Sequence, residues 1–277
     1  THVGCLRKKD NTPISGKEAR DMLDMLYYFF SFAKGTWCNP VCAVGFNSSD
    51  RVWESWSSPE EPGFSRPSSW FDEHHSEQLE NVFPGFMNKW NDEDWNDTLQ
   101  KVIYWYMVAN TSRIDAGIIL AQSALERLSS EHFKANPIKK GNTAKKLRCL
   151  FRDLNIPVDL TENTPILKKL ADKVNNVIDD KLKTLTQDVT KLKSMKQLED
   201  SKWTDSPSAF TGMRNYLVHS KNIYDPLEFG PAIYDSWNLE LWYLELSLLK
   251  ECEYSETYCN RLNSKWVGEV EKVPWEK

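Results

Sequence analysis

The sequence predicts a mainly α-helical protein with a small strand-containing segment near its N-terminus, and three observations lead to this prediction. From about residue 76 onward, apolar residues recur at the spacings of three and four that mark one face of a helix. Cap signals stand at the expected ends of several of these segments. Runs with strand character are confined to residues 41–56, and the 277 residues suffice for one large or two modest domains.

The first predicted element is a helix that begins after Ser15. Ser15 and Glu18 have the spacing of a capping box, and Gly35 is the expected end of the helix. Residues 41–46 and 51–56 have the composition of two strands around a four-residue loop, which predicts a β-hairpin. Because two strands alone are marginally stable, we expect this region to be the tail of a larger mixed domain or to be completed by a partner.

A stretch rich in Ser, Pro and Gly separates this region from the rest of the chain. It runs from residue 57 to residue 70 and has the composition of a linker. We therefore expect a mixed α/β segment over residues 1–70 and a helical domain over residues 71–277.

One cluster of side chains that can bind metal ions follows the linker. It consists of Asp72, Glu73, His74, His75 and Glu77. It is either a candidate metal site or the polar start of a helix, whose acids lie near the positive end of the helix dipole. Adjacent residues on a helix do not converge on one ion, and no third His lies nearby. We expect neither a metal nor a cofactor.

The later elements are predicted from periodicity and caps. Helices are expected over residues 76–90 with a bend at Pro84-Gly85, over 94–109, from about 112 past 128, over 141–152, within 165–198, over 206–220 and over 233–252. In the third of these, Glu126 lies off the apolar stripe. Glu126 is therefore either a solvated charge or a candidate site carboxylate.

Two stretches are rich in basic residues. The first carries Lys139, Lys140, Lys145, Lys146, Arg148 and Arg152, with no acid from residue 138 to residue 151. That stretch is a candidate surface for an RNA phosphate backbone, and a solvated helix face is the alternative. The second lies within residues 165–198, where acids are interleaved with the lysines, so we expect a solvated face there.

The most specific pattern is Arg214-Asn215 followed by His219. Ser206-Pro207 upstream is a helix start, with Ser as the N-cap and Pro at the first helical position. On that helix Asn215 and His219 share a face, and Arg214 is long enough to reach them from its own position off the core. Leu217 and Val218 are expected to point toward the core. The alternative is that Arg214 is a surface ion-pair partner and His219 a residue favoured by the helix dipole.

These residues resemble the motif of the HEPN superfamily, an Arg followed four to six residues later by His, commonly with a polar residue after the Arg. The segment Ala124-Leu125-Glu126-Arg127-Leu128 resembles an early core helix of such domains, and the resemblance covers roughly residues 92–265. It implies a HEPN-like helical bundle. It also implies a metal-independent endoribonuclease of bacterial anti-phage defence or of a toxin-like system, or a catalytically inactive module for dimerisation or for RNA or partner binding.

The chemistry expected of the motif is RNA cleavage by the internal 2′-hydroxyl. His219 can exchange a proton near neutral pH, Arg214 can stabilise the charge that develops on the phosphate, and Asn215 can orient either group. One His cannot easily be both acid and base. The resemblance implies that a homodimer supplies a second motif across a two-fold axis. The wide apolar stripe of the last helix could meet that second protomer, or could serve core packing alone.

Composition limits the other possibilities. A net charge of −5 and a pI of about 5.7 argue against broad, non-specific binding to nucleic acid but allow a local basic groove. We find no apolar run of membrane-spanning length and no signal peptide, and the six scattered Cys suggest a reducing compartment. We therefore expect a cytoplasmic protein with RNA as its partner and no membrane.

Overall fold

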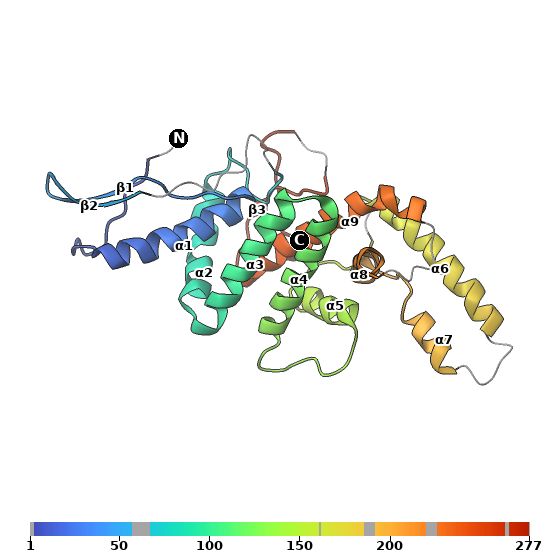
Figure 1. Ribbon diagram of the computed structural model, residues 1–277. Coiled ribbons are helices and arrows are strands. Elements are labelled where there is room, and N and C mark those ends of the chain that lie inside the picture. Colours follow the sequence, from blue (N-terminus) through green and yellow to red (C-terminus); the bar gives the residue numbers. More distant parts are fainter. Residues whose placement is uncertain are drawn as a thin grey trace.

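The computed structural model describes residues 3–56, 67–160, 162–185, 192–219, 226–263 and 266–276, and it is mainly helical (Figure 1). The helices are α1 (Gly16–Lys34), α2 (Glu77–Asn91), α3 (Glu93–Thr111), α4 (Ile114–His132), α5 (Thr143–Asp153), α6 (Pro165–Leu185), α7 (Leu192–Glu199), α8 (Ser206–Val218) and α9 (Pro226–Glu251). The strands β1 (Ala43–Asn47) and β2 (Asp50–Ser55) form one antiparallel pair, and β3 (Thr257–Tyr258) and β4 (Glu271–Lys272) form another.

Helix α1 begins and ends where its caps predict. Ser15 and Glu18 form the complete capping box, and Gly35 takes the left-handed conformation with φ 73°. The buried face of α1 includes Phe29 and Phe32, which share one hydrophobic core with the later helices. Trp70 is fully buried beside α1 and donates its indole N–H to the carbonyl of Phe32. Residues 57–66 of the expected linker lie outside the described residues.

The predicted β-hairpin is confirmed. Strands β1 and β2 pair antiparallel, with an irregularity between Gly45 and Phe46. Apolar side chains of the hairpin remain outside the core, since Phe46 and Val52 are mostly exposed. Figure 1 shows the hairpin beside α1, at the opposite end of the molecule from α6 and α7.

The centre of the helical region is formed by α3, α4 and α9, which pack on one another. The stripe predicted for α4 is buried, and so is nearly every residue of α9 from Leu239 to Leu249. Helices α4, α6 and α8 cover α9 within the same chain. Of the two uses open to the apolar stripe of α9, Leu241 and Leu244 serve core packing, because both side chains are fully buried within this chain, whereas Trp237 is half-buried.

A buried ion pair fixes the segment after α9 to this core. The guanidinium of Arg261 contacts the carboxylate of Glu245 at 2.5 Å, and both side chains are almost completely enclosed. Tyr106 donates its hydroxyl to the same carboxylate at 2.5 Å, and Arg261 also donates to the carbonyl of Ser68. Every charge in this cluster has a partner, as a buried ion pair requires.

A second polar cluster joins α4, α5 and α9 near the surface. The Nδ1 atom of His132 lies 2.5 Å from Glu251, and its Nε2 atom lies 2.6 Å from Asp153. The hydrogen bond to Glu251 raises the pKa of His132 above its ordinary value of 6.5. Burial opposes ionisation of Glu251, but its bonds to His132 and Lys89 lower the pKa of that carboxyl. Both shifts favour the charged pair in the folded state.

We expect this cluster to make stability depend on pH. Because the folded-state pKa of His132 is raised, its contribution is full below the unfolded value of 6.5 and is lost as the pH rises through the raised value. Thermal unfolding of the wild type and of His132→Gln, followed from pH 5.5 to 8.5, measures it. The wild type should lose more Tm than the variant over this range, and parallel curves would contradict the prediction.

Candidate functional site

Helix α8 carries the Arg214-Asn215-His219 pattern, and its start differs by one residue from the prediction. The N-cap is Asp205, whose carboxylate accepts the backbone N–H of Ser208, while the Ser208 side chain completes a capping box. Ser206 is therefore the first helical residue instead of the cap. Asp205 is the better cap here because the guanidinium of Arg148 also holds its carboxylate, with Nη2 of Arg148 2.9 Å from Oδ1.

The last turn of α8 gathers the three residues of the motif. The helix ends at Val218, and His219 is the C-cap, whose backbone N–H donates to the carbonyl of Asn215 at 3.0 Å. Nη1 of Arg214 donates to Oδ1 of Asn215 at 3.4 Å, a long bond. The His219 side chain is exposed and makes no hydrogen bond with any residue in the described ranges. Residues 220–225 lie outside these ranges.

Asn215 and His219 line the same groove, as the helical period predicts. The groove has a volume of about 430 Å³ and lies among the start of α5, the linker from α7 to α8, and α8 itself. In Figure 1, α8 is seen end-on between α5 and α7. The lining residues are Asn142, Ala144, Gln197, Asp200, Ser201, Lys202, Trp203, Ser208, Thr211, Gly212, Asn215, Tyr216 and His219.

The wall of the groove formed by Trp203 is held in place from two sides. The side-chain amide of Asn175 on α6 bonds both the N–H and the carbonyl of Trp203, at 2.8 and 3.0 Å. The indole lies against Gly212 so closely that a Cβ there would stand 2.2 Å from it. A glycine inside a helix costs stability, and this close approach explains its presence in α8.

Arg214 lies partly inside the protein, contrary to the expectation that it sits off the core. Its Nε is buried and has no hydrogen-bond partner among the described residues. Glu240 on α9 is fully buried within electrostatic range of Arg214, and its Oε1 accepts from the hydroxyl of Ser236. Burial raises the pKa of Glu240 well above its ordinary value, which favours the uncharged carboxyl, while the nearby guanidinium of Arg214 opposes this shift. Arg214 makes no ion pair with a residue in the described part of the chain.

The two apolar residues between Arg214 and His219 differ in burial. Leu217 is half-buried and packs against the core, as expected. The prediction for Val218 is wrong, since this side chain is 43% exposed at the end of α8. The helix ends at this residue.

Four of the basic candidates are close in sequence to residues that line the groove. Lys139, Lys140, Lys145 and Lys146 are exposed at or just before the start of α5, next to the lining residues Asn142 and Ala144. Arg148 differs from these lysines, because its guanidinium forms an ion pair with Asp205. The sequence gives no sign of this pairing.

Glu126 is exposed on α4 and accepts a hydrogen bond from Gln122 at 2.9 Å. It does not line the groove, and the structure does not bring it together with the motif.

The acids and histidines after the linker hold the C-terminal loop. His75 Nε2 lies 2.9 Å from the carbonyl of Gly268, and Asp72 accepts the N–H of Gly268 at 3.2 Å. Within the described ranges, no group of three or more His, Cys, Asp or Glu side chains is arranged to hold a metal ion.

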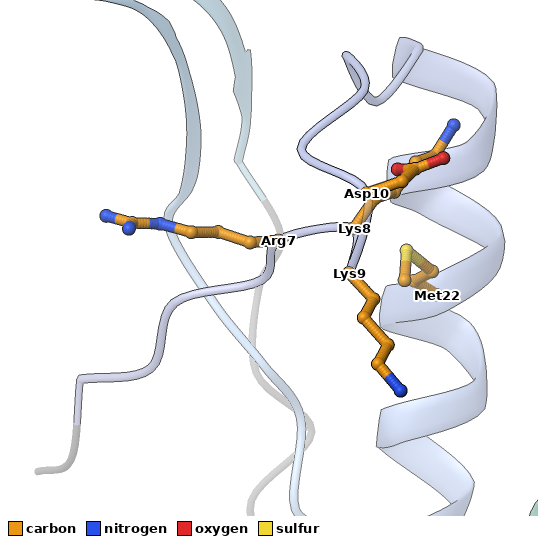
Figure 2. Close-up of a pocket in the computed structure, with 5 residues that line it drawn as sticks. All are labelled: Arg7, Lys8, Lys9, Asp10 and Met22. Atoms are coloured by element: carbon orange, nitrogen blue, oxygen red, sulfur yellow. The ribbon is translucent and has the colours of Figure 1, made fainter.

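A second hollow, of about 560 Å³, lies at the N-terminus and is lined by Arg7, Lys8, Lys9, Asp10 and Met22. Figure 2 shows Arg7 pointing away from α1, whereas Met22 projects from that helix. Lys8 is paired with Glu18 at 2.7 Å. The groups around this hollow do not converge on one point, so the groove beside His219 is the better candidate site.

Sequence reasoning missed most of the residues that line the groove, and it also missed Glu240. Gln197 and Trp203 reach the groove from the linker side, which no local pattern connects to α8. Glu240 carries the one visible signal, a lone acid in the apolar run from Leu239 to Leu244.

Comparison with known proteins gives two domain matches. The profile of the YopA central domain matches residues 1–66, and the profile of the YopA C-terminal domain matches residues 92–188 and 181–272. The SPbeta prophage-derived uncharacterized protein YopA of Bacillus subtilis (strain 168) is 28% identical over 280 residues, which cover 99% of this chain and 58% of that protein.

The chain thus spans little more than half of the length of this relative. No solved structure matches it. Neither matching domain description names the HEPN superfamily, so that resemblance stays a prediction. None of the described helices combines the length and apolarity needed to cross a lipid bilayer.

Proposed function

The chain belongs to the family of the YopA C-terminal domain, and we propose that it is a metal-independent endoribonuclease of the HEPN type. One observation carries the proposal. An arginine with no ion-pair partner among the described residues and an exposed histidine share the last turn of α8, beside a groove. An unpaired guanidinium is suited to a phosphate, and an unbonded imidazole is suited to proton transfer.

The reaction follows from these groups. A His219 imidazole takes the proton of the RNA 2′-hydroxyl, whose oxygen attacks the adjacent phosphorus. The bond from O2′ to phosphorus forms and the bond from phosphorus to O5′ breaks, while an acid gives its proton to O5′. Arg214 stabilises the extra negative charge on the phosphate, and Asn215 orients it. The products are a 2′,3′-cyclic phosphate and a free 5′-hydroxyl.

A second copy of the chain completes this site. Each chain supplies one His219, and separate groups act as base and acid in the step. A two-fold homodimer brings a second motif to the same phosphate, and it is the commonest symmetric oligomer. The buried stripe of α9 does not form this contact, so the surface around the end of α8 is the proposed interface.

The lysines before and within α5 extend the site along the substrate. Lys139, Lys140, Lys145 and Lys146 lie exposed where α5 approaches the groove. They supply a local positive surface for the RNA backbone on a chain whose net charge is −5. The prophage origin of the relative supports a role in conflict between phage and host, acting on RNA in the cytoplasm.

The direct test is incubation of the purified chain with end-labelled single-stranded RNA in excess EDTA. Specific cleavage products support the proposal. The absence of products over a range of RNA sequences and protein concentrations would remove it.

Arg214→Lys separates a bidentate role from a general charge effect. We expect it to be nearly as damaging as Arg214→Ala, because Lys keeps the charge but loses the planar fork. Loss of one such donor costs about 3–4 kcal/mol, or roughly 10²–10³ in rate. Cleavage rates measure it, with the exposed Arg20→Lys on α1 as the matched control. Near-wild-type cleavage by Arg214→Lys would contradict the assigned role.

The second candidate is a catalytically inactive HEPN-like module that dimerises or binds RNA or another partner. The enclosed Nε of Arg214 and its nearness to Glu240 favour it, since a side chain held this way also serves packing. If the wild type and His219→Ala both bind RNA and neither cleaves it, the result identifies this second candidate.

A further inference from the structure

We propose that the groove beside His219 binds one unpaired nucleotide next to the cleaved bond, with its base inside the groove and its phosphates outside. The proposal rests on the proposed function and names the substrate as single-stranded RNA with a base preference at this position. The volume of about 430 Å³ falls in the range of small-ligand sites and suits a base with its sugar.

The first support is a buried hydroxyl that needs a partner. Thr211 is 8% exposed, lines the groove, and its Oγ1 has no hydrogen-bond partner among the described residues. A buried polar atom without a partner costs free energy, which a hydrogen-bonding ligand recovers. Thr211 therefore places an unsatisfied hydroxyl within the wall of the groove.

The second support is the chemistry of the lining. Three side-chain amides, those of Asn142, Gln197 and Asn215, belong to it. The oxygen of Asn142 already accepts the N–H of Lys145, which leaves its NH2 group as a donor. Amides offer donors and acceptors side by side, as the edges of nucleobases do, and unpaired RNA bases are read in this way.

The third support is the distribution of charge. Lys202 in the lining is paired with Asp179 at 2.7 Å, and Asp200 in the lining makes no ion pair with a described residue. An unpaired carboxylate repels a phosphate but accepts from the exocyclic amino group of a base. The phosphates then lie on the exposed lysines at the rim, Lys145 among them.

Aromatic walls complete the pocket. Tyr216 is half-buried on α8, and Trp203 is fixed by Asn175, so the groove exists before any ligand binds. Aromatic side chains stack on unpaired bases in proteins that bind single strands.

The test compares cytosine with uracil, which have nearly the same shape but exchange an amino group for a carbonyl. Fluorescence anisotropy gives Kd for labelled hexamers of 2′-fluoro-cytidine and 2′-fluoro-uridine, which lack the nucleophile and cannot be cleaved. The wild type should bind the cytidine hexamer at least about fivefold more tightly, the effect of one base-edge contact. Asp200→Asn should remove most of this difference, while the exposed Asp172→Asn on α6 should keep it.

Equal affinities for the two hexamers in the wild type, or an unchanged difference in Asp200→Asn, would overturn the proposal. Asp200 is exposed, so its replacement leaves folding intact. The two proposals can fail separately. Discrimination between the hexamers without cleavage of ordinary RNA supports the nucleotide-binding groove and contradicts the endoribonuclease. Cleavage without discrimination supports the endoribonuclease and contradicts base binding in the groove.

Discussion

Replacing His219 by Ala is expected to lower RNA cleavage by about 10²- to 10⁴-fold, the usual contribution of a positioned acid or base. The loss lies toward the upper end if both copies of a dimer use this residue, one as base and one as acid. Cleavage of labelled RNA under single-turnover conditions measures the chemical step.

Folding should not change in His219→Ala. The side chain is exposed at the C-cap of α8 and makes no hydrogen bond within the described ranges. The Tm should therefore equal that of the wild type. His74→Ala, which alters another mostly exposed histidine far along the chain, is the matched control and should cleave normally. A His219→Ala protein with the wild-type rate would contradict the assigned role.

Replacing Arg261 by Met is expected to lower the free energy of unfolding by about 3–5 kcal/mol, the cost of breaking a buried ion pair. The change leaves the carboxylate of Glu245 enclosed, with Tyr106 as its one remaining hydrogen-bond donor among the described residues. Urea denaturation measures the difference.

Two further variants test the reason for this loss. The Arg261→Met/Glu245→Leu double variant should recover a large part of the stability, because no uncompensated charge remains. Lys272→Met, which breaks an exposed pair with Glu256, should cost about 0–1 kcal/mol. A loss below about 1 kcal/mol in Arg261→Met would show that the buried pair does not stabilise this core.

Local patterns in the sequence were sufficient for most helices and for the first hairpin, but not for strands β3 and β4 or for the start of α9 at Pro226. The cap of α1 at Ser15, its end at Gly35 and the hairpin follow from residues that lie close together in the chain. The period of α8 also placed Asn215 and His219 in the same groove. Short-range geometry is a property of the sequence itself, and these predictions needed nothing else.

Contacts between distant residues could not be predicted in this way. Arg148 resembled a phosphate ligand until the structure paired it with Asp205, 57 positions away. The stripe of α9 resembled a dimer surface because the covering helices α4, α6 and α8 are defined only by tertiary packing. The groove is likewise formed by three separate segments. The hydrophobic periodicity of one segment does not predict its contacts with the other two.

The products of cleavage test the central claim most directly. RNA incubated with the protein in excess EDTA should give 5′ fragments that end in a 2′,3′-cyclic phosphate, identified by mass spectrometry. A substrate with one 2′-deoxy sugar at the cleavage position should remain intact at that position, because the 2′-hydroxyl is the nucleophile. Activity that is lost in EDTA and restored by Mg²⁺ or Mn²⁺, or equal cutting of single-stranded DNA, would contradict the account.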